Sequence, residues 1–178
     1  MQNLLAALRK EIFPIGLILI LALARLIPHP PNFTPVIAVA ILSGYFFKNL
    51  NFSLIILLIA MLISDLFIGF YENVFFVYAS LLLITFIFHK ISKKINFKNL
   101  FIFSFAGSLI FFIISNFGVW ILGSPGVDNL PYDKNLNGLI ECYILAIPFF
   151  GNTFLSTVIF SYPAIIAYRS LATRSSTR

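Results

Sequence analysis

The stretch LFIFSFAGSLIFFIISNFGVWIL, residues 100–122, contains no charged side chain. A helix of roughly 20 residues crosses the ~30 Å hydrocarbon core of a bilayer, and this run is long enough to do so. Asn116 and Trp120 lie near its carboxyl end, one helical turn apart on one face. The stretch therefore predicts a transmembrane helix that carries polar groups near one end.

The rest of the chain has the same apolar character. Its 178 residues are 60% hydrophobic and 10% charged, whereas soluble domains average about a quarter charged. A water-soluble fold of this size has too little interior for so much apolar surface, so we predict an integral membrane protein. The net charge of +6 does not indicate a nucleic-acid partner, because the charges lie at the ends of apolar segments. Cys142 is the only cysteine, which excludes a disulfide within the chain.

Six apolar runs predict an all-α, polytopic bundle in which residues 1–178 form a single transmembrane domain. The runs are residues 12–27, 35–47, 52–70, 74–88, 100–122 and 139–168. The last run is too long for one simple crossing, and Pro148 and Gly151 interrupt it. We expect an outer part near 139–149 and a main span near 152–170, with the helix broken or kinked where they join.

The basic residues predict the orientation, because cytoplasmic loops carry an excess of Lys and Arg. With the amino terminus in the cytoplasm, only Arg25 and Lys134 of the twelve basic residues fall outside. The other ten fall inside: Arg9, Lys10, Lys48, Lys90, Lys93, Lys94, Lys98, Arg169, Arg174 and Arg178. We therefore predict six helices with both termini cytoplasmic. One alternative is a signal peptide cleaved near residues 18–25, which would leave five spans in the same orientation.

Two charged residues are expected at membrane depth, where a charge is costly and usually has a role. Arg25 lies near the outer end of the first run, and Asp65 lies about two-thirds along the third, which also runs outward. They reach a similar depth, so we predict that they interact. Such an ion pair either lines a ligand cavity or is purely structural; an arginine that reaches to the interface is a further alternative.

More polar and aromatic side chains are expected at the same outer level, whereas the inner half is nearly all Leu, Ile and Phe. The candidate substrate-binding residues are Arg25, His29, Asn32, Asp65, Asn116, Trp120, Glu141, Tyr143 and Asn152. This asymmetry favours a pocket that opens outward and is closed toward the cytoplasm. It does not favour a continuous channel, which would need polar lining along its whole length.

The segment RLIPHPPNFTP, residues 25–35, contains four prolines and connects the first two runs. Proline prevents continuous helix and favours stiff, extended backbone. Pro35 is suited to begin the next helix, and Thr34 is placed to cap it. We expect residues 28–34, here called the strap, to cover an outward pocket framed by Asn116, Trp120, Tyr143 and Asn152. The alternative is a rigid interfacial turn that only sets the angle between two helices.

Four stretches resemble a bacterial family of small six-helix membrane proteins without an established function. They are RLIPHPPNFTPVIAVAILSGYFF (25–47), LISDLFIGFYEN (62–73), GSLIFFIISNFGVW (107–120) and GLIECYILAIPFFGNT (138–153). The resemblance spans nearly the whole chain and implies a multi-pass protein of the bacterial cytoplasmic (inner) membrane.

More distantly, the chain is similar to the substrate-binding S components of energy-coupling-factor (ECF) vitamin transporters. That similarity implies binding of a vitamin-like micronutrient from outside, with transport driven by an ATP-dependent partner module. It also implies ligand contacts at Asn116, Trp120, Glu141, Tyr143 and Asn152.

The chain shows no HExxH, G-x-S-x-G, nucleotide-binding loop or Cys/His metal-ligand spacing, so we expect no enzyme activity and no cofactor or metal. Three function classes stay open: a substrate-binding uptake component, a self-contained small carrier or channel, and a non-transporting membrane scaffold. The polar outer half favours the first, with the lipid bilayer, a small solute and an energising module as partners. A dry, tightly packed outer half would favour the scaffold.

Overall fold

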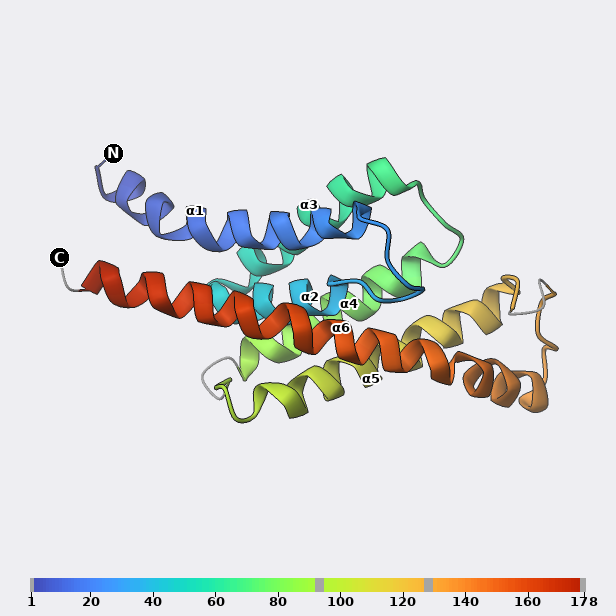
Figure 1. Ribbon diagram of the computed structural model, residues 1–178. Helices are drawn as coiled ribbons and strands as arrows, with labels where there is room; N and C mark the ends of the chain where they lie inside the picture. Colours follow the sequence, from blue (N-terminus) through green and yellow to red (C-terminus); the bar gives the residue numbers. More distant parts are fainter. Residues whose placement is uncertain (1, 92–94, 127–129, 177–178) are drawn as a thin grey trace.

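The computed structural model describes residues 2–91, 95–126 and 130–176 and shows an all-α bundle (Figure 1). Its helices are α1 (Gln2–Leu23), the 3-10 turn η1 (Ala24–Leu26), α2 (Val36–Phe46), α3 (Leu50–Ile68), α4 (Val74–Lys90), α5 (Leu100–Leu122) and α6 (Leu136–Ser176). The prediction of six helices is confirmed for the described residues, and α5 has the predicted bounds. Lys93, Lys94 and Arg178, which entered the charge count, lie outside the described residues.

Three of the helices are long and apolar enough to span a membrane. They are α3, α5 and the part of α6 that covers Leu136–Ser170. The helices α2 and α4 are also apolar but shorter. Length and composition therefore support a membrane protein.

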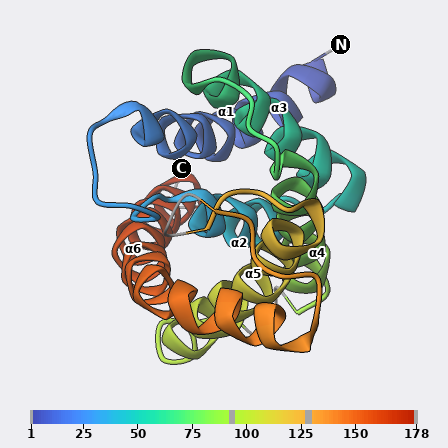
Figure 2. The ribbon, with the colours of Figure 1, turned by 90° about the vertical axis from the view of Figure 1, so that its right-hand side faces the viewer.

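The short helix α2 lies at the centre of the bundle and contacts α1, α3, α4, α5 and α6 (Figure 2). Every residue of α2 except Tyr45 is buried, because the helix is apolar on all sides. Its closest neighbour is α4: a Cβ at Gly44 would lie 2.6 Å from the Thr85 carbonyl oxygen. The Thr85 hydroxyl also donates a hydrogen bond of 2.9 Å to the Ala40 carbonyl. Glycine at position 44 thus lets the two backbones approach closely.

The helix α6 is one uninterrupted helix, so of the break or kink predicted near Pro148 and Gly151 the break is wrong. Its early part, orange in Figure 2, and its red remainder run in different directions, so the axis changes direction without a break. A proline within a helix removes one backbone N–H, and membrane helices tolerate this where neighbouring groups satisfy the freed carbonyls. Just beyond the proline, the Thr153 hydroxyl donates a hydrogen bond of 2.9 Å to the Phe149 carbonyl, which adds a bond within this part of the helix.

The connections alternate between the two ends of the bundle, as the charge pattern predicted (Figure 1). One end holds both ends of the described chain and residues 47–49, 91 and 95–99. The other end, here called the strap end, holds the strap, the connection 69–73 and the described parts, 123–126 and 130–135, of the 123–135 connection. Arg25 and Lys134 are the basic residues at the strap end among those the structure describes.

Candidate functional site

The strap is docked on α6 through its backbone carbonyls. The Asn152 amide donates a hydrogen bond of 2.9 Å to the Pro31 carbonyl, and the Ser156 hydroxyl donates one of 2.9 Å to the Thr34 carbonyl. A longer bond of 3.4 Å runs from the Thr153 hydroxyl to the Asn32 carbonyl. Prolines lack an N–H group, so carbonyls are the main backbone groups that the strap must satisfy, and α6 supplies the donors.

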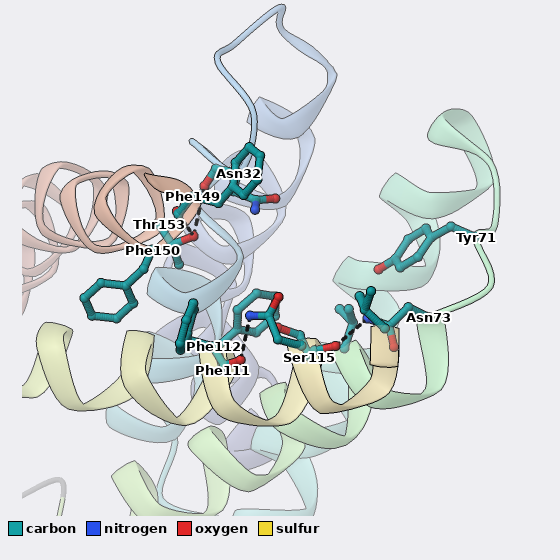
Figure 3. A pocket seen from close by; sticks show the side chains of 12 residues that line it. Asn32, Tyr71, Asn73, Phe111, Phe112, Ser115, Phe149, Phe150 and Thr153 are labelled. Atoms are coloured by element: carbon teal, nitrogen blue, oxygen red, sulfur yellow. Dashed lines mark hydrogen bonds between the residues drawn. The ribbon is translucent and has the colours of Figure 1, made fainter. Parts of the chain in front are cut away.

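Asn32 adopts a left-handed backbone conformation with φ of 59°, which no other non-glycine residue in the described part of the chain shares. Asparagine tolerates this region better than most residues. The turn brings the Asn32 side chain over the bundle (Figure 3). The predicted cap by Thr34 is wrong: α2 begins after Pro35, with no side-chain cap, and Thr34 instead offers its carbonyl to α6.

A cavity of about 210 Å³ lies beneath the strap, where the sequence predicted one (Figure 3). For scale, an engineered cavity of about 150 Å³ in another protein binds benzene. Residues from the strap, the 69–73 connection, α4, α5 and α6 line it. They are Asn32, Tyr71, Asn73, Val77, Phe111, Phe112, Ser115, Asn116, Val119, Phe149, Phe150 and Thr153.

A second hollow of about 280 Å³ adjoins this cavity. The two share Asn32, Asn116, Val119 and Phe149 in their linings. The second one continues toward the 123–135 connection, where Pro125, Gly126 and Tyr132 line it. Asn32 and Asn116 therefore lie at the boundary between the inner cavity and a wider vestibule.

Two asparagines of the cavity are partly committed to the fold. The Asn116 side-chain NH₂ donates to the Phe112 carbonyl at 2.8 Å, and its side-chain oxygen, Oδ1, has no donor among the described residues. The Asn73 amide donates to the Ser115 carbonyl at 2.8 Å and so ties the start of α4 to α5. The Asn73 side-chain oxygen is buried against Gly118. It occupies the space that a Cβ atom at position 118 would need, so this contact requires glycine there.

Arg25 and Asp65 form the predicted ion pair. The Arg25 Nη1 lies 2.7 Å from the Asp65 Oδ1, with side-chain exposures of 9% and 0%. The Tyr78 hydroxyl donates to the other Asp65 oxygen at 2.7 Å, and Arg25 also donates to the Ser64 hydroxyl at 2.6 Å. Neither charged residue lines the cavity. The pair joins η1 to α3 and, through Tyr78, to α4.

Tyr71 connects the ion pair with the cavity. It lines the cavity wall, and its hydroxyl interacts electrostatically with Asp65 and Arg25. Burial, together with the negative charge of Asp65, raises the pKa of Tyr71 to about 12, although Arg25 opposes the change. The hydroxyl is therefore protonated at neutral pH and remains an uncharged hydrogen-bonding group.

Three of the residues expected to frame the pocket do not line the cavity: Trp120, Tyr143 and Asn152. The Trp120 indole donates to the Asp133 carbonyl at 2.8 Å, and Lys134 in turn donates to the Trp120 carbonyl. The Tyr143 hydroxyl donates to the Ile113 carbonyl at 2.7 Å. In this structure the polar groups of these side chains hold α5, α6 and the strap together.

The other two predicted residues, His29 and Glu141, are exposed. His29 is hydrogen-bonded to the carbonyl of Pro30 at 2.9 Å, and Glu141 lines a separate groove of about 240 Å³ beside Gly126 and residues 130–133. No group of three or more His, Cys, Asp or Glu side chains that could hold a metal ion gathers among the described residues. Of the nine predicted site residues, the cavity brings together Asn32 and Asn116.

The aromatic walls were missed by sequence reasoning. Phe111, Phe112, Phe149 and Phe150 supply them, from α5 and α6. A signal was present, since Phe112 and Val119 lie four before and three after Asn116 and so share its helix face. The 22 phenylalanines of the chain hid this signal, because most runs of the sequence contain them.

The chain belongs to a family of unknown function, DUF6580, whose model matches residues 6–177. No curated protein and no solved structure matches it. The predicted resemblance to an uncharacterised family is thus confirmed, whereas these comparisons contain nothing that links the chain to S components.

Proposed function

We propose that this protein is the substrate-binding membrane component of an uptake system for a small micronutrient. The observation that carries the proposal is the cavity beneath the strap, with polar and aromatic walls from α4, α5, α6 and the 69–73 connection. Small-molecule sites typically combine aromatic walls with a few placed polar groups. The strap gives the cavity a stiff cover, so little entropy is lost when a solute binds.

The proposed orientation places the strap end outside a bacterial cytoplasmic membrane, with six spanning helices and both termini inside. The distribution of basic residues supports this orientation, since the strap end holds only Arg25 and Lys134 of the nine that the structure describes. A solute would then enter from outside through the vestibule next to the 123–135 connection.

The opposite half of the bundle supports an uptake component over a channel. Ile41, Phe88 and Leu100 are each no more than 1% exposed there and fill the space around α2. A solute therefore cannot pass without a rearrangement of the helices. The sequence carries no nucleotide-binding motif, so we propose that a separate module drives this change, as the similarity to S components also implies.

Equilibrium dialysis against a small-molecule extract of the source cells tests the binding function directly. Mass spectrometry should find a small solute enriched by the purified wild-type protein and not by Val119→Trp, whose side chain would fill both hollows. Ile102→Trp is the matched control, because residue 102 is 64% exposed on the same helix. Equal enrichment profiles for wild type and Val119→Trp would overturn the proposal and favour a scaffold.

A further inference from the structure

The lining of the cavity contains no charged side chain among the residues that the structure describes. The buried charges of Arg25 and Asp65, which act on Tyr71 of the lining, neutralise one another at 2.7 Å. A charged solute would give up its hydration on entry without gaining an opposite charge, and burial of an unpaired charge is far more costly than burial of a hydrogen-bonded neutral group. The electrostatics therefore favour an uncharged solute.

The walls favour a flat ring. Phe112 of α5 and Phe150 of α6 are in contact, with ring centroids 5.4 Å apart and planes at 70°. Phe111 and Phe149 extend this aromatic surface along the same two helices. Aromatic side chains attract other rings by stacked or edge-on contact, in addition to the area that they bury. The volume of about 210 Å³ suits a solute of one or two rings.

Among the polar groups of this lining, two that adjoin the vestibule have no partner among the described residues. The Asn32 side chain makes no hydrogen bond there and points from the strap into the cavity (Figure 3). The Asn116 side-chain oxygen, Oδ1, accepts none, since the hydrogen bond of this side chain is the one that its NH₂ group donates to the Phe112 carbonyl. An amide side chain can pair with a solute edge that carries a donor beside an acceptor. Asn116 then adds an acceptor for a second donor.

We propose that the site selects an uncharged aromatic solute of one or two rings that carries an amide-like edge, a hydrogen-bond donor beside an acceptor. This inference rests on the proposed binding function and adds the chemical class of the solute. Asn32 and Asn116 recognise the polar edge, and the four phenylalanines hold the ring. The strap thus contributes a ligand contact as well as a cover.

A matched set of single-ring probes tests the inference: benzamide, benzoate and the benzylammonium ion, at pH 7. Their binding to the purified full-length protein is measured by isothermal titration calorimetry in detergent. We expect benzamide to bind at least tenfold more tightly than either ion. Benzoate or benzylammonium binding as tightly as benzamide, or no benzamide binding at millimolar concentration, would overturn the inference.

Asn32→Asp provides a second measurement that keeps the fold, because aspartate also tolerates the left-handed conformation at this position. The new carboxylate should shift the preference from benzamide toward benzylammonium by at least tenfold. Asn51→Asp, an exposed position in the first turn of α3 at the opposite end, is the control and should leave the preference unchanged. Equal shifts in the two variants would show that residue 32 does not contact the solute.

The dialysis experiment separates the two proposals. Enrichment of a charged solute that Val119→Trp abolishes would leave the binding function intact and overturn the neutral class. Loss of any difference between wild type and Val119→Trp would overturn the binding function itself.

Discussion

Removal of either member of the Arg25–Asp65 pair should destabilise the protein by about 3–5 kcal/mol, because the charge left behind has no counter-ion. In Arg25→Gln, the Asp65 carboxylate is fully buried and keeps only the Tyr78 hydroxyl at 2.7 Å. In Asp65→Asn, the Arg25 guanidinium is 9% exposed and keeps the Ser64 hydroxyl at 2.6 Å. Arg25 also keeps a weak hydrogen bond of 3.8 Å to the Met61 sulfur, so both variants retain neutral hydrogen-bond partners and lose the ionic one.

A change of 1 kcal/mol shifts the melting temperature by about 2–4 °C for a chain of 150–250 residues. The expected loss for each single variant is therefore a fall of about 6–20 °C, measured in detergent from the temperature dependence of the far-ultraviolet circular dichroism. Lys48→Gln, an exposed basic residue at the opposite end, is the control and should change stability by no more than about 0.5 kcal/mol.

The double variant Arg25→Gln/Asp65→Asn distinguishes a true pair from two independent losses. Its destabilisation should be smaller than the sum of the single changes, because no unpaired charge is left in the interior. Strict additivity within about 0.5 kcal/mol would refute the reasoning. A fall of less than about 2 °C in both single variants would also refute it, since it would mean that water reaches the pair.

Two further predictions concern packing and orientation. Gly118→Ala should destabilise the protein and weaken solute binding, because the added Cβ would collide with Asn73. Gly151→Ala should instead raise stability by about 0.5–1 kcal/mol, because alanine has the higher helix propensity and its Cβ would meet no neighbour within 4 Å. Thermal unfolding of both variants checks this, and an equal effect of the two would contradict it. With Cys142 replaced by serine, a cysteine at exposed position 72 should react with an impermeant thiol reagent outside intact cells, and one at position 98 should not. Labelling at 98 from outside would contradict the proposed orientation.

The helix positions were predictable because each helix is an apolar run between polar turns. The run at 100–122 has the same bounds in the structure. The continuity of α6 was not predictable from Pro148, because a proline removes one hydrogen bond and the neighbours decide whether the helix breaks. Apolar patterning gives the length of a helix, whereas its continuity at a proline depends on tertiary contacts.

The sequence predicted at which level of the bundle the candidate residues lie, but not which of their side chains face the cavity. Trp120 and Tyr143 do lie toward the strap end, yet their polar atoms bond to backbone carbonyls of Asp133 and Ile113. A sequence shows which residues reach a level of the bundle, and packing decides which of them face the interior. Asn32 was placed correctly beside the cavity because the prolines around it leave the strap little freedom.

The cavity follows from the length of the central helix. At 11 residues, α2 is about 17 Å long, roughly half the ~30 Å of a hydrocarbon core, whereas α5 with 23 residues is about 35 Å long. No residue of α2 lines the cavity, so at the strap end the longer helices must enclose a space that α2 does not fill. The segment that precedes α2 covers this space, and it must cross the bundle with few backbone groups left to satisfy. Four prolines between residues 28 and 35 meet this requirement, and the hydroxyl and amide donors of α6 bind the carbonyls that remain. The features that close the bundle at this end therefore also build the cavity and its cover.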